Sequence, residues 1–150
     1  MSKFVKIDRS IPFNPVSFIG RGWSVVEQDN ASLMLSEIDL DKVKLETMLK
    51  DGEGCVTGED KLKRLKDEKF IRLDAKVLQT LWENKNLIPE SWSQITDSVH
   101  YVFFDGTVLK DLDGDRFVPC LVWQNGEWDR SYGQLYFYWM EDSPSAVLKS

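Results

Sequence analysis

The chain has 150 residues, of which 42% are hydrophobic and 29% charged, and its formal net charge is −6. A chain of this length buries about 70% of its unfolded surface, so we expect one domain over residues 1–150 that needs no metal or disulfide for stability. The acidic balance argues against a nucleic-acid-binding surface, because affinity for phosphates depends on clustered Lys and Arg. No stretch is long and apolar enough to insert into a membrane, and no apolar leader opens the sequence, so a cytoplasmic location is expected.

The first part of the chain predicts short strands and turns. Two strand-like runs, 23–26 and 33–35, are separated by the polar residues 27–32, a pattern typical of a β-hairpin. Asp41 is expected to cap a short turn or helix that reaches Leu49. The cysteines, Cys55 and Cys120, lack metal-binding spacing and predict two reduced, mostly buried thiols, with a disulfide as the alternative.

Two helices are predicted in the middle of the chain. Thr57 opens a T-x-x-D sequence that is typical of a capping box, after which Leu62 and Leu65 fall on one face. The basic residues around these leucines predict a solvated helix face, which includes Lys61, Lys63, Arg64 and Lys66. The second helix is expected to begin at Asp74 and to end near Asn84. Its core-facing stripe consists of Val77, Leu78, Leu81 and Trp82.

The remainder of the chain predicts β-structure. Residues 100–109 and 116–123 are rich in β-branched and aromatic residues, and the polar stretch 110–115 joins them. Asn125-Gly126 predicts a second tight turn, and residues 145–149 could close the sheet. The predicted fold class is therefore α+β, with two central helices packed on a mainly C-terminal antiparallel sheet.

Motifs for catalysis or metal binding are incomplete. The run FFDGTVL resembles the D-x-D-G-T motif of haloacid-dehalogenase phosphatases, but Phe103 stands in place of the nucleophilic Asp, so Asp105-Gly106 predicts a turn. The only histidine, His100, has no neighbouring ligands that could complete a zinc site. We therefore predict no catalytic residues and no cofactor.

Three aspartates have the spacing that opens an EF-hand calcium loop. They are Asp111, Asp113 and Asp115. The sixth position of such a loop requires Gly and the twelfth Glu, whereas Arg116 and Val122 occupy them here. The stretch thus predicts a hairpin turn and no metal site.

Aromatic residues are concentrated between about residues 123 and 143. Three of the four tyrosines and three of the six tryptophans lie between Trp123 and Trp139, and no lysine occurs between Lys110 and Lys149. If residues 135–140 form one strand, alternation directs Leu135, Phe137 and Trp139 to the core and the intervening side chains outward. A surface rich in Tyr and Trp and poor in Lys is typical of binding sites.

The candidate binding residues are the polar and aromatic positions of this segment that alternation leaves outside the core, together with their neighbours. They are expected to form one contiguous area: Asp129, Arg130, Ser131, Tyr132, Gly133, Tyr136, Tyr138, Met140, Glu141, Asp142 and Ser143. The alternative is that these rings are ordinary core beneath a long loop or against the helices.

The chain resembles a group of uncharacterised short bacterial proteins, many of them from candidate-phylum genomes. The resemblance is carried by EQDNASLMLSEIDLDKV, TGEDKLKRLK, IRLDAKVLQTLWENKNLIPESW, FFDGTVLKDLDGDRFV and PSAVL, which cover most of the sequence. The group is similar in layout to the variable proteins of diversity-generating retroelements, whose hypervariable patch lies near the C-terminus of a C-type-lectin-like fold. This resemblance implies a variable surface just before PSAVL.

In such proteins adenine-directed mutagenesis of Asn codons yields many residue types but not Trp, Met, Glu, Gln or Lys. Met140 and Glu141 would therefore be fixed positions, and relatives tend to carry Trp where Arg130 and Gln134 stand here. The residues that fit variable codons are Asp129, Ser131, Tyr132, Gly133, Tyr136, Phe137, Tyr138, Asp142 and Ser143. Listing Phe137 as variable conflicts with alternation, which places it in the core.

The sequence thus predicts a non-catalytic domain that presents a C-terminal aromatic patch to a protein or other macromolecular ligand. The alternative function is a small enzyme or enzyme regulator that uses surface carboxylates. Calcium-site motifs of true lectins are not evident, so sugar binding is not expected.

Overall fold

The computed structural model describes residues 3–150, which form a mixed α+β fold. Within this range there are four α-helices, α1 (Pro15–Phe18), α2 (Asn30–Leu33), α3 (Gly58–Asp67) and α4 (Ala75–Glu83), and three 3-10 helices, η1 (Leu40–Lys42), η2 (Lys85–Leu87) and η3 (Glu90–Gln94). The strands are β1 (Phe4–Lys6), β2 (Ser24–Gln28), β3 (Glu37–Asp39), β4 (Lys44–Glu46), β5 (Val56–Thr57), β6 (Ile71–Arg72), β7 (His100–Phe103), β8 (Thr107–Lys110), β9 (Arg116–Gln124), β10 (Glu127–Gln134), β11 (Tyr138–Trp139) and β12 (Ser145–Leu148).

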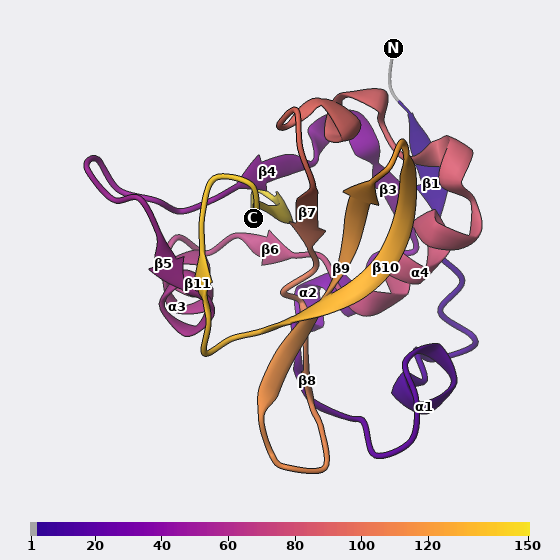
Figure 1. Cartoon of the computed structure of the whole chain (residues 1–150). Coiled ribbons are helices and arrows are strands. Elements are labelled where there is room, and N and C mark those ends of the chain that lie inside the picture. The colour runs from indigo at the N-terminus through magenta and orange to yellow at the C-terminus, as the bar shows by residue number, and fades with distance from the viewer. Residues whose placement is uncertain (1–2) are drawn as a thin grey trace.

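One large, mainly antiparallel sheet organises the molecule (Figure 1). Its path runs β2-β8-β9-β7-β12-β4, with β10 paired to β9 and β6 paired to β12. The pair of β7 and β12 is parallel, and the other pairs of this sheet are antiparallel. Two small two-stranded sheets accompany it, β1 with β3 and β5 with β11.

Strand β9 pairs with three other strands of the C-terminal half, β10, β8 and β7. Strand β10 pairs along one edge of β9 through the tight turn at Asn125-Gly126, where both residues have positive φ (56° and 77°) as the predicted turn requires. The opposite edge of β9 pairs first with β8 and then with β7. The β-structure predicted for 100–109 and 116–123 is thus confirmed, with the first run divided by a turn into β7 and β8, and β12 forms the strand predicted near 145–149.

The two faces of the sheet carry two separate cores, because side chains alternate along each strand. Val102 and Leu121 belong to the larger core, on the side of α4, whereas Phe103 and Cys120 belong to a smaller core on the side of α3. Strand β10 therefore also has an α4 side and an α3 side.

Helix α4 forms as its sequence predicts. Asp74 caps it by accepting the backbone N–H of Lys76, and the helix ends at Asn84. Val77, Leu78 and Leu81 are buried in the larger core, and Trp82 is partly buried against it.

Helix α3 is also confirmed, but its solvated face is smaller than predicted. The Thr57 hydroxyl accepts the N–H of Asp60, and Leu62 and Leu65 are buried. Lys61, predicted to be solvated, is wholly buried. Its side chain reaches the carbonyl of Ser143, a partner 82 positions away that the local charge pattern cannot indicate.

The predicted hairpin over 23–35 is wrong. Strand β2 pairs with β8, some eighty residues later in the chain, and the segment 30–33 is the short helix α2. The short turn or helix expected to begin with a cap at Asp41 and to reach Leu49 is also wrong, because Asp39 caps the short turn η1 and β4 follows it. In both places long-range strand pairing overrides the local pattern.

Asp105-Gly106 forms a turn between β7 and β8, as predicted. A Cβ at Gly106 would lie 2.2 Å from the carbonyl oxygen of Arg72 and 2.6 Å from the carbonyl carbon of Leu73. Glycine is therefore required here by the close approach of two backbone segments. Among residues 3–150 no helix has the length and apolar character needed to cross a membrane.

Candidate functional site

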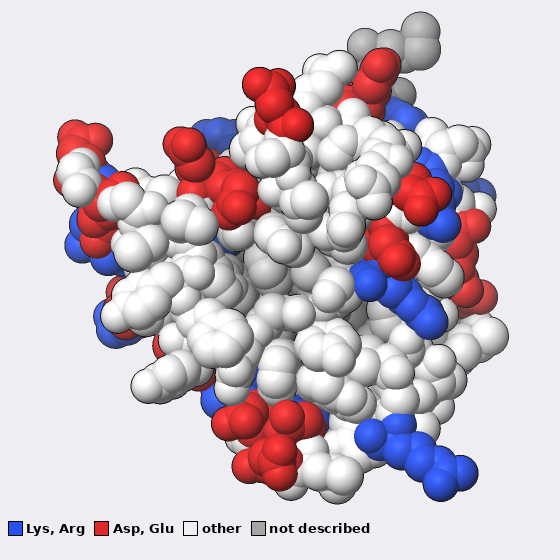
Figure 2. Space-filling model, viewed as in Figure 1, with Lys and Arg blue, Asp and Glu red and all other residues white. Residues whose placement is uncertain are grey.

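The most exposed aromatic surface of the chain is a protruding segment that we call the aromatic lobe, residues 135–141. Tyr136 is 79% exposed, Phe137 60%, Tyr138 69% and Met140 51%. Figure 2 shows uncharged surface over this part of the molecule, at the left of the view, with acidic side chains above and below it. The predicted outward orientation of Tyr136, Tyr138 and Met140 is confirmed.

The prediction that Phe137 is core is wrong. Strand β10 ends at Gln134, and a turn follows in which the N–H of Phe137 donates to the carbonyl of Gln134 (3.1 Å). This turn interrupts the two-residue period on which the prediction rested. Leu135 and Trp139 are buried as predicted, but Phe137 projects between them into solvent.

The lobe is attached to the N-terminal end of α3 through backbone atoms. Strand β11 pairs with β5, the N–H of Gly58 donates to the carbonyl of Phe137 (3.0 Å), and the N–H of Glu59 donates to the carbonyl of Leu135 (2.9 Å). Helices have free N–H groups in their first turn, and here the lobe supplies their acceptors. None of these bonds depends on which side chains the lobe carries.

Lys61 adds a further bond to a backbone oxygen at the end of this segment. Its Nζ donates to the carbonyl of Ser143 and lies 5.0 Å from the ring centre of Trp139 and 5.6 Å from that of Phe103. Burial lowers the pKa of Lys61 to about 8, although the nearby charge of Asp105 acts in the opposite direction.

Two buried anchors hold the lobe in the smaller core. Leu135 is wholly buried, and the ring of Trp139 stacks on Phe103 with their centres 4.0 Å apart and their planes 11° apart. The stack occupies the space beside Gly133, where a Cβ would lie 2.6 Å from Phe103 Cε1. Gly133 was predicted as a display position, but the fold has no room for a side chain there.

Strand β10 divides the other predicted residues between two surfaces. Ser131 and Asp129 lie opposite Cys120 and Val122 and so share the α3 side with the lobe. Arg130 and Tyr132 point to the α4 side. The prediction of one contiguous area on connected turns is therefore wrong, because these residues belong to a regular strand with alternating faces.

Arg130 and Tyr132 contact aromatic rings on that opposite side. The guanidinium carbon of Arg130 lies 4.3 Å from the ring centre of Phe18 and 4.4 Å from that of Trp82. Tyr132 is 43% exposed and packs against Trp23, with ring centres 4.6 Å apart.

The last three predicted residues form the end of the lobe and the start of its connection to β12. Glu141 is exposed, Asp142 is partly buried and accepts a hydrogen bond from the Ser143 hydroxyl (2.8 Å), and Ser143 is buried. The Asp142 carbonyl also accepts the N–H of Tyr101 (2.8 Å). Ser143 therefore belongs to the attachment of the segment and not to its displayed surface.

Two open grooves flank the lobe. One, of about 540 Å³, is lined by Tyr136 and Phe137 together with Glu59, Asp115 and Arg116. The other, of about 480 Å³, is lined by Met140, Glu141 and Asp142 with residues of the 49–54 and 96–98 segments. The lobe is thus a ridge between two grooves, and both grooves carry carboxylates.

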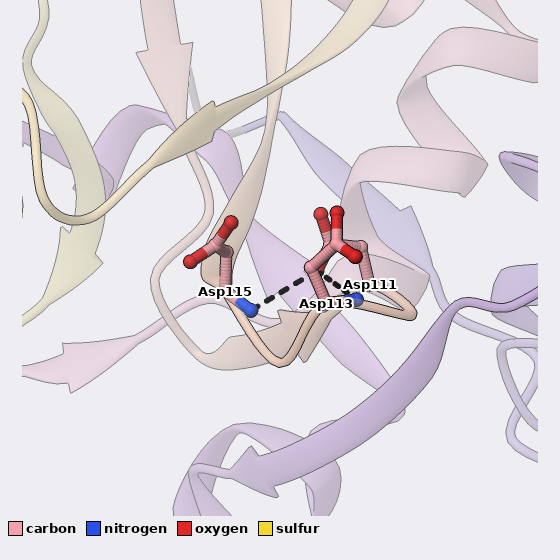
Figure 3. Close-up of side chains that lie close together, drawn as sticks. All are labelled: Asp111, Asp113 and Asp115. Carbon is pink, nitrogen blue, oxygen red and sulfur yellow. Dashed lines mark hydrogen bonds between the residues drawn. The ribbon is translucent and has the colours of Figure 1, made fainter.

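The aspartates of the 111–115 turn lie close together, as Figure 3 shows. Ligand atoms of Asp111, Asp113 and Asp115 all lie within 4.8 Å of one another. One carboxylate oxygen of Asp111 accepts the N–H of Asp113 (3.1 Å) and of Asp115 (3.0 Å), which closes the turn between β8 and β9. Arg116, at the EF-hand glycine position, is paired with Glu59 (2.8 Å). The aspartate cluster therefore stabilises the hairpin turn that the sequence predicts.

Several titratable side chains are buried away from the lobe. His100 contacts the carbonyls of Trp92 (2.9 Å) and Ser98 (3.1 Å) through its two ring nitrogens, which is a structural role. Burial raises the pKa of the Cys120 thiol, while Cys55, expected to be buried, is exposed, and both are free thiols. The Asp105 carboxylate is wholly buried and accepts no hydrogen bond from residues 3–150.

Comparison with known proteins adds no assignment to this geometry. No family model matches the sequence, and neither a curated protein nor a solved structure matches the chain.

Proposed function

We propose that the protein is a non-catalytic binding protein whose aromatic lobe, residues 135–141, contacts a protein partner. The observation that carries this proposal is the exposure of four large apolar side chains, Tyr136, Phe137, Tyr138 and Met140, on one short segment. Single apolar residues are common on surfaces, whereas a contiguous group is typical of an interaction site. Tyrosine gives a large contact area at a small cost in side-chain entropy.

The way in which the lobe is held supports this proposal. Its bonds to α3 use the carbonyls of Leu135 and Phe137, and its buried contacts use Leu135 and Trp139. The exposed rings therefore contribute little to the attachment, which leaves them available for a partner.

The same attachment supports the resemblance to variable proteins of diversity-generating retroelements. Backbone bonds tolerate many side chains at Tyr136, Phe137 and Tyr138, as a variable surface requires. A near-copy of the final coding segment beside a reverse-transcriptase gene is the genomic observation expected from this proposal. If no such near-copy is present, the lobe would be a binding surface of fixed sequence and not a variable one.

Two finer assignments accompany the proposal. We assign the fold to the C-type-lectin-like class, which the retroelement resemblance implies and with which an α+β fold agrees; an experimental structure that superposes poorly on lectin domains would contradict it. We place the protein in the cytoplasm, an assignment supported by the two free thiols.

Site-specific photo-crosslinking tests the binding function. A benzophenone amino acid is placed at Tyr138 or, as a control, at Met34, which is 84% exposed and lies outside the lobe. In extract from the source organism, the Tyr138 probe is expected to give a specific adduct that excess unlabelled wild-type protein removes.

The competitor variant Tyr136→Ser/Phe137→Ser/Tyr138→Ser decides the outcome. It is expected to leave the adduct in place, because it lacks the contacting rings. Equal competition by this variant, or an adduct of the same identity and yield from the Met34 probe, would contradict the proposal. A catalytic activity that survives the triple substitution would favour the alternative of a small enzyme.

A further inference from the structure

Arg130 has an unusual environment on the α4 side of β10. Its guanidinium carbon lies 4.3 Å from the ring centre of Phe18 and 4.4 Å from that of Trp82, and these two rings are nearly perpendicular (86°). Contacts with two rings restrict the orientation of the guanidinium, and they occupy no hydrogen-bond acceptor, so its N–H donors remain available to a ligand.

Within residues 3–150 no carboxylate forms an ion pair with this guanidinium. Between Lys110 and Lys149 the cationic side chains are Arg116 and Arg130. Arg116 is paired with Glu59 and Glu27, whereas the Arg130 side chain makes no ion pair or hydrogen bond with any residue from 3 to 150. An oriented and unpaired arginine is well suited to an acidic side chain, because a charge-assisted hydrogen bond to a carboxylate is stronger than a neutral one.

The arginine lies beside an unpaired strand edge. The carbonyl of Pro119 accepts the N–H of Phe104 (2.9 Å) and so points away from β10. Tyr132 is the partner of Pro119, and its N–H and C=O must therefore point away from β9. Among residues 3–150, β9 is the only strand that pairs with β10, so this edge can accept another strand.

A small pocket completes the arrangement. It has a volume of about 200 Å³ and is lined by Phe18, Ile19, Arg130, Ser131 and Tyr132. Pockets for cofactors and drug-sized molecules usually span about 300–1,000 Å³, so this one matches a single side chain.

We propose that the edge of β10 at Arg130–Tyr132 binds an extended segment of a partner protein, with an acidic side chain of that segment on the Arg130 guanidinium. The segment adds a strand to the sheet through Tyr132, and its carboxylate enters the pocket beside Phe18. The Arg130 N–H now donates to Asp129 Oδ1 (2.8 Å), a bond that the incoming strand replaces. This site is on the opposite face of β10 from the aromatic lobe and does not depend on it.

The test is an NMR titration of isotope-labelled protein with two short acetylated and amidated peptides, TVEVT and TVQVT. The acidic peptide is expected to bind about tenfold more tightly, since a bidentate charge-assisted bond is worth more than a neutral one. Shifts are expected at the Tyr132 amide and the Arg130 Nε, and the lobe variant Tyr136→Ser/Tyr138→Ser is expected to give the same titration.

Arg130→Gln is expected to abolish the preference for the acidic peptide. If that variant is not folded, Arg130→Lys serves instead, because it keeps a charge but loses the planar fork and is expected to reduce the preference. No binding at millimolar peptide, equal binding of the two peptides, or shifts confined to Tyr136–Tyr138 would each overturn the proposal. Free acetate binding as tightly as the acidic peptide would also overturn it, because the strand edge would then contribute nothing.

Discussion

The two sides of the central sheet hold their neighbouring segments by different means. On one side, helix α4 inserts Val77, Leu78 and Leu81 into the larger core, so its position depends on side chains. On the other side, the aromatic lobe is held by backbone bonds to α3 and by two buried anchors, Leu135 and Trp139. Side chains therefore fix α4 in place, whereas most side chains of the lobe are exposed and take no part in its attachment.

Substitution of a buried anchor of the lobe should lower the free energy of unfolding about as much as substitution of a buried residue of α4. Trp139→Ala removes a ring stacked on Phe103 and is expected to lower the free energy of unfolding by about 3–5 kcal/mol. Leu81→Ala, the matched change in α4, is expected to cost about 2–5 kcal/mol. Denaturant unfolding measures both, and a loss below about 1 kcal/mol for either variant would mean that its face of the sheet is packed differently.

Gly133 tests where the buried contacts of the segment end and its displayed surface begins. Gly133→Ala is expected to cost about 1–3 kcal/mol, because a Cβ would lie 2.6 Å from the Phe103 ring. Ser131→Ala, two positions earlier on the same face, is expected to stay within about 0.5 kcal/mol. The melting temperatures of the two variants provide the measurement. If Gly133→Ala does not lower stability, position 133 can carry a side chain and belongs to the displayed surface.

The buried Lys61 predicts that the free energy of unfolding depends on pH. Its pKa falls from an ordinary value of 10.5 to about 8 in the folded protein because of burial. Above pH 8 the unfolded chain therefore binds more protons at this residue than the folded chain does, so stability rises with pH. We expect a gain of about 1 kcal/mol between pH 7 and 9.

The variant Lys61→Met isolates this contribution, because it keeps an apolar stem but cannot titrate. The rise should be absent from the variant in urea unfolding measured across this range. From about pH 8 upward the buried Cys120 thiol, whose pKa is raised by burial, opposes the gain in both proteins. An identical pH profile for both proteins would show that Lys61 is not held as a buried titrating group.

Local patterns were sufficient for the parts of the fold that local contacts determine. The caps at Thr57 and Asp74 and the turn at Asn125-Gly126 satisfy backbone groups within a few residues, and all three were predictable. The pairing of β2 with β8 was not, because a strand's partner far along the chain leaves no local signal. The same reason explains Lys61, whose acceptor is the distant carbonyl of Ser143.

The candidate site was predicted in part. Alternation correctly placed Tyr136, Tyr138 and Met140 outside, but the turn after Gln134 changed the period and exposed Phe137. The same alternation, applied to the regular strand β10, separates Arg130 from Ser131, although proximity in sequence had grouped them. Periodicity is therefore informative only where the limits of a strand are known.

The most direct test of the central claim is the unfolding free energy of the variant Tyr136→Ser/Phe137→Ser/Tyr138→Ser, compared with that of Leu135→Ser/Trp139→Ser. Each displayed position is expected to contribute no more than about 0.5 kcal/mol, so the triple variant should unfold close to the wild type. The anchor variant should be unfolded or severely weakened, because it introduces polar groups into the smaller core. If the triple variant proves as damaging as the anchor variant, the exposed rings stabilise the fold, and the lobe is not a surface reserved for a partner.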